Sequence, residues 1–255
     1  MVAIPVSIRQ GQRADGVDPR AELQGVVDRL LAGERRITAL DAGCGSGIHI
    51  RLSRNARVVG IDICQTRLAG NPFISQRILG DIQHHDVGEE RFDLVMCWDV
   101  LEHLPEPEKA LRSFVRAAKM DGAILLALPN IYSLKGLIAK FTPHRFHIWV
   151  YRGIFKSRNA GKPGYPPFPT FLRPAISPRA LKRFAAENNL REEYFRLYEG
   201  PAIKKLESGS PLLYAVYKLT LVLLKLASLG AYDGSKSDLF VVFRRRAMGR
   251  PQSAG

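Results

Sequence analysis

Short apolar runs separated by helix-like patterns dominate the first half of the chain. Strands are predicted at 37–42, 57–62, 78–82, 92–98 and 123–130, because each run is short and mostly apolar. Helices are predicted over 18–33 and 105–119, and a third directly after Gly47. This alternation is typical of a parallel sheet with helices on both faces. We therefore predict an α/β fold.

The pattern breaks after Asn130. Residues 131–174 contain six prolines, nine aromatic residues and no acid, which predicts an irregular segment inserted as a cap over the sheet. Regular patterning returns with a helix that starts at Ser177 and with strands at 193–198 and 238–244. We predict a single domain over 1–255, with a loose arm at 1–17 and an apolar helical insertion at 201–235.

The stretch from Ile37 to Ile50 carries the first functional pattern. Its apolar start is followed by Gly43, Gly45 and Gly47 at alternate positions. A strand, a glycine turn and a helix together present backbone N–H groups to a ligand. Glycine tolerates positive φ in such a turn and has no Cβ to block a ligand that lies against the backbone.

Polar residues follow the ends of the predicted strands. Asp62, Asp81, Asp99 and Asn130 all occupy such positions, at the edge of a parallel sheet where ligands bind. Asp62 comes 21 residues after Asp41, where an acid can accept hydrogen bonds from both ribose hydroxyls. Asp81 can reach the amino group of an adenine. An acid at the end of each of two strands makes the glycine pattern much more specific.

These motifs resemble a known family. The runs D-A-G-C-G-S-G, G-I-D-I, G-D-I and F-D-L-V with E-H-L are similar to class I S-adenosylmethionine-dependent methyltransferases, and within them to type 11 and type 23 domains that include ubiquinone-biosynthesis O-methyltransferases. The resemblance implies a Rossmann-like, mostly parallel sheet of seven strands with an antiparallel last strand. It also implies a cofactor site for S-adenosylmethionine that consists of Asp41, Gly43, Cys44, Gly45, Gly47, Asp62, Ile63, Asp81, Ile82 and Trp98.

The residues after the fourth strand are the candidates for catalysis. The resemblance places Asp99 beside the methyl-transfer site, and His103 can act as a general base for a hydroxyl acceptor. Some relatives hold a divalent metal with a similar pattern, so Asp99, Glu102 and His103 could do the same. Alternatively, Glu102 and His103 only shape the loop. We assign no metal.

The predicted cap combines basic and aromatic side chains. This combination suits a pocket for an acidic or phosphorylated small molecule, a lipid headgroup surface or nucleic acid, and it also suits a solvated loop. We predict a lid over the acceptor site, since the segment follows the fifth strand. The predicted acceptor-binding residues are Asn130, Tyr132, His144, Arg145, His147, Trp149 and Arg152.

Charge is distributed unevenly along the chain. The net charge is +14, yet residues 1–130 hold 16 Lys/Arg against 17 Asp/Glu. Residues 131–174 hold 8 against 0, and residues 175–255 hold 14 against 7. A one-sided basic surface attracts phosphate, carboxylate, nucleic acid or anionic lipid. The three cysteines are scattered, and the N-terminus has no signal-peptide pattern. We therefore predict a location in the reducing cytoplasm, with the inner face of the membrane as an alternative.

Residues 212–229 form an apolar stretch interrupted by Lys218 and Lys225. Each lysine at the centre of a bilayer would cost about 2.5–3.5 kcal/mol, which disfavours a spanning helix. A core helix, a homodimer contact and a helix on the surface of an anionic membrane remain as alternatives.

Together these patterns predict a methyltransferase that uses S-adenosylmethionine. The predicted acceptor is a hydroxyl, or less readily an amine or carbon, on a small or lipid-linked anionic molecule. Two alternatives are an RNA methyltransferase and a non-catalytic, membrane-associated module that binds S-adenosylmethionine. A nucleic-acid partner is disfavoured because the sequence contains no recognisable RNA-binding module.

Overall fold

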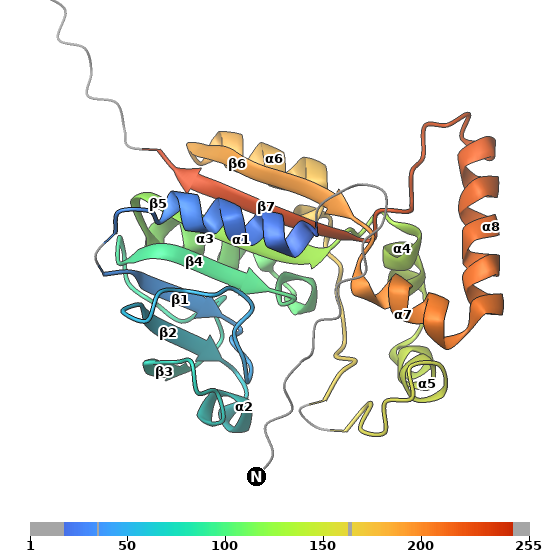
Figure 1. Cartoon of the computed structure of the whole chain (residues 1–255), viewed down its shortest axis with the longest axis horizontal. Helices are drawn as coiled ribbons and strands as arrows, with labels where there is room; N and C mark the ends of the chain where they lie inside the picture. Colours follow the sequence, from blue (N-terminus) through green and yellow to red (C-terminus); the bar gives the residue numbers. More distant parts are fainter. Residues whose placement is uncertain (1–17, 35, 163–164, 247–255) are drawn as a thin grey trace, which may run out of the picture.

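The computed structural model describes residues 18–34, 36–162 and 165–246, so the predicted arm at 1–17 lies outside the described residues. The described residues form a sheet in the order β3-β2-β1-β4-β5-β7-β6 (Figure 1). Pairs from β3 to β5 are parallel, and β7 runs antiparallel to both β5 and β6. The predicted seven-stranded fold is therefore confirmed. The strands are β1 (Thr38–Ala42), β2 (Arg57–Asp62), β3 (Gln76–Leu79), β4 (Phe92–Trp98), β5 (Ala118–Pro129), β6 (Leu190–Tyr198) and β7 (Asp238–Arg245).

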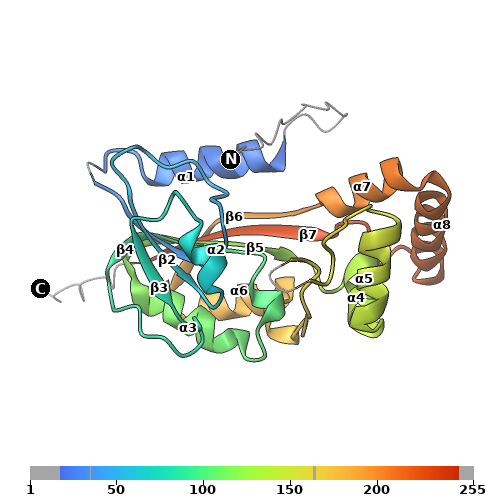
Figure 2. The ribbon, with the colours of Figure 1, turned by 90° about the horizontal axis from the view of Figure 1, so that it is seen from below.

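Helices cover both faces of the sheet, as predicted. The helix α1 (Pro19–Leu30) lies on one face, whereas α3 (Pro107–Ala117) and α6 (Pro178–Glu187) lie on the other (Figure 2). Asp18 caps α1 by accepting a hydrogen bond from the Arg20 N–H at 3.1 Å. Ser177 caps α6 in the same way. The short helix α2 (Gln65–Ala69) contacts β2 and β3.

The predicted helix after Gly47 is absent, and this prediction is wrong. Residues 47–56, which we call the irregular segment, form bends, turns and irregular backbone instead. The Gln24 side chain of α1 explains the difference, because it accepts from the Arg51 N–H and donates to the Arg51 carbonyl, both at 2.9 Å. The His49 ring also stacks on Trp98 at 4.6 Å. These contacts with distant residues replace the hydrogen bonds that a helix would have made within the segment.

The predicted irregular cap also requires correction. Residues 131–174 contain α4 (Leu134–Phe141), α5 (His144–Gly153) and the short 3-10 helix η2 (Pro174–Ile176). Ser133 caps α4 by accepting from the Gly136 N–H at 2.9 Å, and Pro143 separates the two helices. Apolar residues with helical spacing are present in 134–141. We did not predict a helix there because the segment 131–174 as a whole is rich in proline and basic residues. In the described residues of the second half, 154–162 and 165–173, the structure assigns turns, bends and irregular backbone and no helix or strand.

Two further helices, α7 (Pro201–Gly209) and α8 (Pro211–Ala227), connect β6 to β7. Together with α4 and α5 they lie beyond the carboxyl end of β5, at the right of Figure 1, and we call these four helices the helical lobe. Leu134, Ile203, Tyr217 and Leu221 form a small core inside it. No helix in the described part of the chain has the length and apolar character needed to cross a bilayer.

Candidate active site

The glycine loop, residues 43–47, connects β1 to the irregular segment that ends at residue 56. Gly43 and Gly45 have φ angles of +76° and +51°, which favour glycine. A Cβ on Gly43 would lie 2.2 Å from Val100, and one on Gly45 would lie 2.4 Å from the Arg67 guanidinium. At Gly47 a Cβ would meet nothing within 4 Å. The first two glycines thus allow close packing of the protein itself, and only the third borders open space.

Two side chains from outside the loop fix its shape. Asp62 accepts hydrogen bonds from the backbone N–H groups of Gly45 and Cys64, both at 2.8 Å. The fully buried Asn71 donates to the carbonyls of Cys44, Gly45 and Gly47 at 3.0–3.3 Å. Sequence reasoning missed Asn71, since an asparagine before a proline indicates only a turn.

Asp41 is buried next to this loop. None of the described residues forms a hydrogen bond or an ion pair with its carboxyl group. Burial, and secondarily the charge of Asp62, raise the pKa of Asp41 to about 7. A cationic ligand group would stabilise the ionised form of this carboxyl.

An apolar surface lies beside Asp62. Ile63 is 77% exposed and Leu79 is 54% exposed, and Leu79 is the partner of Asp62 in the parallel β2–β3 register. An acid next to exposed apolar side chains suits a ribose and an adenine ring. Ile82 is different, because its side chain is buried in the core and only its backbone could face a ligand.

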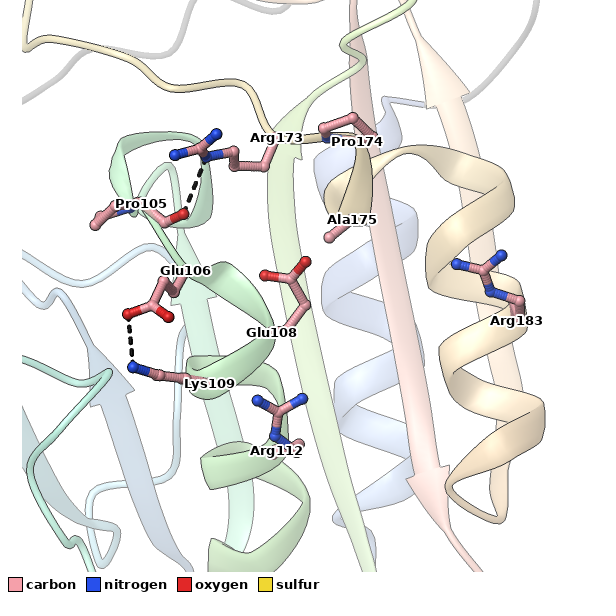
Figure 3. Close-up of a pocket in the computed structure, with 9 residues that line it drawn as sticks. All are labelled: Pro105, Glu106, Glu108, Lys109, Arg112, Arg173, Pro174, Ala175 and Arg183. Carbon is pink, nitrogen blue, oxygen red and sulfur yellow. Dashed lines mark hydrogen bonds and ion pairs between the residues drawn. The ribbon is translucent and has the colours of Figure 1, made fainter.

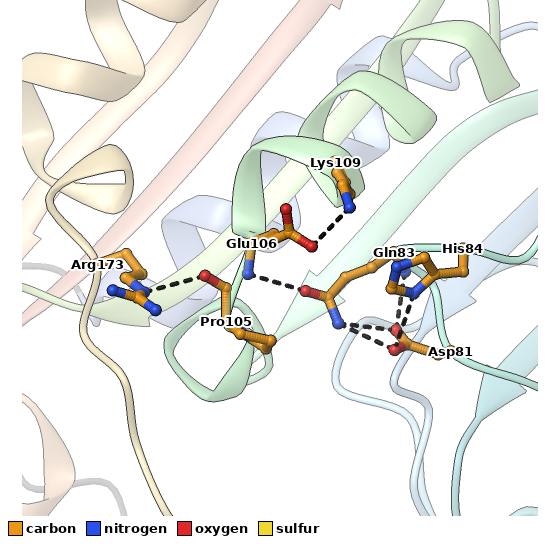
Figure 4. Close-up of polar contacts among 7 residues, drawn as sticks. All are labelled: Asp81, Gln83, His84, Pro105, Glu106, Lys109 and Arg173. Carbon is orange, nitrogen blue, oxygen red and sulfur yellow. Dashed lines mark hydrogen bonds and ion pairs between the residues drawn. The ribbon is translucent and has the colours of Figure 1, made fainter.

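Asp81 organises the loop after β3. Its carboxylate accepts from the Gln83 N–H at 2.9 Å and contacts His84 Nδ1 at 3.3 Å. Burial opposes ionisation, but these hydrogen bonds leave the pKa of Asp81 below its usual value. Gln83 in turn accepts from the Glu106 N–H at 2.9 Å, which ties the loop to the start of α3 (Figure 4).

Two predicted cofactor residues have their side chains in the interior. Cys44 packs with Val58, Leu68 and Ile74, and burial raises the pKa of its thiol to about 12. Trp98 is buried between Phe240 and the His49 ring. Burial and then the nearby Arg20 lower the pKa of His49 to about 4.

Asp99 follows β4 in a left-handed conformation with φ +51°. Solvent reaches its side chain, but burial by surrounding atoms and the charge of Asp238 raise the pKa of Asp99 to about 6, against the opposing effect of Lys135. Asp238 forms an ion pair with Lys135 at 2.7 Å. Burial, followed by the charges of Asp99 and Asp238, raises the pKa of Tyr151. The Tyr151 side chain is therefore close enough to both carboxyl groups to be affected by their charge.

We call Asp99, Glu102, Lys135, Tyr151 and Asp238 the Asp99 cluster. Lys135, Tyr151 and Asp238 were not predicted as site residues. Lys135 and Asp238 are 103 positions apart, so no local signal relates them.

His103 belongs to the short 3-10 helix η1 (Leu101–His103). Its Nδ1 lies 2.6 Å from the Pro169 carbonyl. A carbonyl can only accept, so Nδ1 carries the proton and Nε2 retains a free lone pair. Burial is the main reason that the pKa of His103 is lowered. His103 is therefore a neutral base at pH 7.

Glu102 is buried beside His103, with 3.9 Å between Glu102 Oε1 and His103 Nε2. Its Oε2 has no hydrogen-bond partner. Burial, followed by the charge of Asp99, raises the pKa of Glu102 well above its usual value. Among the described residues, no group of three His, Cys, Asp or Glu side chains is arranged to hold a metal. The alternative metal site at Asp99, Glu102 and His103 therefore has no geometric support.

Residues 165–173, which we call the strap, connect the base to the glycine loop. Phe168 meets the His103 ring edge-on at 5.8 Å, and the Arg67 guanidinium lies over Phe168 at 5.3 Å. Arg67 also lies against Gly45. The backbone N–H of Phe171 donates to the Glu102 carbonyl at 2.8 Å. The candidate base and the glycine loop are thus parts of one continuous set of contacts.

The predicted acceptor-binding residues do not form one group. Asn130 is buried and builds the turn after β5, because its amide binds the Lys236 carbonyl and the Tyr132 N–H. The others lie on or near the helical lobe. His147 contacts Thr142 at 2.7 Å, Arg152 donates to the Ala160 carbonyl at 3.0 Å, His144 has a buried Nδ1 without a partner, and Tyr132, Arg145 and Trp149 are exposed.

A pocket of about 720 Å³ lies between α3, η2 and α6 (Figure 3). Charged side chains such as Lys109, Arg112 and Arg183 line it, together with Glu106 and Glu108. It contains none of the predicted site residues, so it is separate from the glycine loop and His103.

The fold and the glycine loop define a class I methyltransferase. The sequence profile of the methyltransferase-domain family, type 23, matches residues 16–192, and the chain belongs to this family. The family uses S-adenosylmethionine.

Curated relatives include two ubiquinone biosynthesis O-methyltransferases. The protein from Pseudomonas entomophila is 31% identical over 110 residues, which is 39% of this chain and 46% of the relative. The protein from Hahella chejuensis is 29% identical over 158 residues, which is 54% of this chain and 60% of the relative. The chain thus matches about half the length of these relatives.

A solved structure shows the same fold. Geranyl diphosphate C-methyltransferase from Streptomyces coelicolor, in complex with Mg²⁺, geranyl diphosphate and S-adenosyl-L-homocysteine, superposes with a TM-score of 0.54. Its sequence is 13% identical, and the match covers 88% of this chain and 78% of the other.

Proposed function

We propose that this protein moves a methyl group from S-adenosylmethionine to a hydroxyl of an anionic acceptor that is small or lipid-linked. The observation that carries the hydroxyl assignment is the geometry of His103, whose Nδ1 is held by the Pro169 carbonyl while Nε2 is free to take a proton. A hydroxyl acceptor needs such a base, because it must lose its proton during transfer.

The residues at the glycine loop fit the cofactor. Asp41 offers a buried carboxyl without a partner for a cationic group, and Asp62 lies beside the exposed Ile63 and Leu79. Arg67 now lies against Gly45, so a cofactor that contacts Gly45 must displace this flexible side chain. When bound, S-adenosylmethionine supplies an activated methyl group on a positively charged sulfur. The protein then has to align the acceptor and remove one proton.

His103 Nε2 accepts the proton that the acceptor oxygen loses as that oxygen becomes bonded to the methyl carbon. The hydrogen bond to Pro169 keeps the ring in the tautomer that this step requires. The carboxyl group that lies beside His103 Nε2 is that of Glu102, whose Oε1 is 3.9 Å from this nitrogen. Phe168 packs against the His103 ring, and 26% of the His103 side chain remains exposed for contact with an acceptor.

The basic composition of 131–174 supports an anionic acceptor. This segment holds 8 Lys/Arg and no Asp/Glu, and it follows β5 directly. Lys135 is neutralised by Asp238, so the attraction must come from the other cations of the segment, such as Arg145. A phosphate or carboxylate on the acceptor would complement them.

The decisive experiment incubates the full chain with radiolabelled S-adenosylmethionine and fractionated cell extract. We expect label in the small-molecule or lipid fraction, in a product that is stable to mild acid and base, as an ether is. Loss of label with the Asp62→Ala variant is the matched negative control.

Label in the RNA or protein fraction would contradict the acceptor class. Binding of S-adenosylhomocysteine without label in any fraction would favour a non-catalytic binding module instead. A labelled amine or a new carbon–carbon bond in the product would contradict the hydroxyl assignment alone.

A further inference from the structure

The helix α8 has two apolar faces, and only one of them is covered. Tyr217 and Leu221 are buried against the rest of the helical lobe. The opposite side is open to solvent, and α8 stands at the outer edge of the lobe, far from the sheet (Figures 1 and 2). Eight large apolar side chains on α8 and just after its end are at least 41% exposed, and we call them the outer face. They are Leu212, Leu213, Val216, Leu219, Val222, Leu223 and Leu226 of the helix, and Leu229 two residues beyond it.

The polar residues of α8 border the outer face. Lys218 and Lys225 are seven positions apart, so they share one stripe along the helix. The Thr220 hydroxyl donates to the Val216 carbonyl at 2.9 Å, so its polar group is satisfied within the helix. The helix contains no acid. An apolar face bordered by lysines is typical of a helix that lies in the interface of a membrane.

We propose that α8 docks the protein on an anionic lipid bilayer, with its outer face at the boundary between headgroups and acyl chains and its lysines among the headgroups. Spanning is a different arrangement, which needs about 20 apolar residues. The whole helix has only 17 residues, and two of them are lysines. The remaining lobe contributes further positive charge, including Lys204 and Lys205 of α7, and exposed aromatic side chains such as Phe141 and Trp149.

Charge and area favour a bilayer over a second copy of the chain. Two copies paired through the outer face would bring together four lysines and no acid from the two helices, and each chain carries a net charge of +14. The outer face offers eight large side chains. A standard protein interface uses roughly 20–30 residues on each side. An anionic membrane instead complements the lysines at about 1 kcal/mol, or about fivefold in affinity, for each.

The docking surface is connected to the Asp99 cluster by a short segment of the chain. The segment after α8 leads directly into β7, which begins at Asp238. The Tyr232 hydroxyl donates to the Tyr132 carbonyl at 2.9 Å, and the Leu134 N–H donates to the Gly234 carbonyl at 3.0 Å. Membrane binding does not depend on methyl transfer, but it would give the proposed site access to acceptors in the lipid phase.

Flotation of the full chain with lipid vesicles tests the proposal. At physiological ionic strength we expect the protein to float with vesicles of phosphatidylcholine and phosphatidylglycerol, and to float at least tenfold less with phosphatidylcholine alone. Leu219→Glu with Leu226→Glu should reduce binding to anionic vesicles at least tenfold. Lys218→Gln with Lys225→Gln should weaken binding and reduce its dependence on salt.

The control for added charge is Ser53→Glu with Ala186→Glu, at two exposed positions outside the lobe. This variant changes net charge equally and should float like the wild type. Circular dichroism and binding of S-adenosylhomocysteine should be unchanged in all three variants. A Leu226→Trp variant gives a second readout that leaves the face apolar, because brominated lipid should quench its fluorescence if the residue enters the acyl region.

Three results would overturn the proposal. The first is wild-type protein that stays at the bottom with anionic vesicles. The second is flotation that survives Leu219→Glu with Leu226→Glu. The third is a dimer in sedimentation velocity that this double variant dissociates while vesicles are not bound, since a second copy would then cover the face.

Discussion

The glycine loop and the helical lobe are organised by opposite means. The loop is held by buried polar side chains, with Asp62 and Asn71 making five hydrogen bonds to its backbone and to Cys64. The lobe has a small apolar core and leaves much of its apolar surface exposed. The two regions also differ in net charge. Residues 1–130 are nearly neutral, whereas residues 131–174 contain Lys and Arg but no Asp or Glu.

This difference separates what each region can specify. A loop fixed by directional hydrogen bonds suits one rigid cofactor, and few changes there are tolerable. A basic surface with exposed aromatic and aliphatic side chains selects by charge and hydrophobicity, which many acceptors could satisfy. Variants in the two regions should therefore have different effects. Changes at the glycine loop should weaken cofactor binding, and changes at His103 should lower the rate of methyl transfer.

The largest expected effect comes from His103→Gln. Loss of a general base typically costs about 10²- to 10⁴-fold in rate, so kcat should fall by that factor. The affinity for S-adenosylhomocysteine should stay within twofold, as measured by calorimetry. His85→Gln, at an exposed histidine, is the matched control. Equal loss of cofactor affinity would show that His103 belongs to the donor side instead.

The pH profile provides a second test of His103. Its pKa lies below the usual 6.5, so kcat/KM should fall as the pH drops through that lowered pKa and protonates the base. Well below it, the decline approaches tenfold per pH unit. The acidic limb should vanish in His103→Gln and persist in Asp99→Asn. If Asp99→Asn alone removed the limb, Asp99 would be the titrating group.

Asp62→Ala should act on the other region. It removes the acceptor for two backbone N–H groups as well as the proposed ribose contact. At about 1.5–3 kcal/mol for each hydrogen bond to a charged group, binding of S-adenosylhomocysteine should weaken at least about 100-fold. Asp86→Ala, at an exposed carboxylate, should bind normally. Unchanged affinity after Asp62→Ala would place the cofactor elsewhere.

Asn71→Ala also changes the glycine loop, and it should weaken cofactor binding less than Asp62→Ala does. The side chain touches no proposed ligand position, so it acts by positioning the loop through three carbonyls. We expect about tenfold weaker binding of S-adenosylhomocysteine, with the rate at saturating cofactor nearly unchanged. Asn188→Ala, at the end of α6, removes an asparagine that bonds only within its own helix and should leave binding intact.

Asp41→Asn should stabilise the free protein while it weakens cofactor binding. The folded-state pKa of Asp41 is raised from 3.8 to about 7, so this group favours folding at low pH and loses that contribution as the pH rises through 7. The variant should therefore have a higher Tm at pH 8, by about 2–4 °C for each kcal/mol, and an equal Tm near pH 4. A lower Tm at pH 8 would mean that Asp41 has a stabilising partner.

The sequence predicted the positions of the strand-end acids better than the contacts of the helical lobe, for a physical reason. Strand ends and glycine spacing are local patterns, so they suffice to place Asp41, Asp62 and Asp81 at one edge of the sheet. Asn71 and Gln24 act across 24–27 positions and leave no local trace. The same holds for the pairing of Lys135 with Asp238.

The two errors about secondary structure have different origins. The segment after Gly47 has an apolar pattern that suits a helix, but contacts with Gln24 and Trp98 hold it in an irregular conformation, so tertiary contacts overrode the local pattern. In 134–141 the apolar residues do have helical spacing, and Leu134 packs in the small core of the lobe. The following helix, α5, has no buried residues.

The irregular segment after the glycine loop also has a consequence for how the protein folds. In a loop that leads into a helix, much of the turn is stabilised by neighbours in sequence. Here the loop depends on Gln24, Asp62 and Asn71, which must all be in place first. These residues lie 17–27 positions from their partners, so each contact requires closure of a chain segment of that length. The cofactor site should therefore emerge only when α1 and α2 have docked on the sheet, so a nascent chain that ends after β2 would not yet bind its donor.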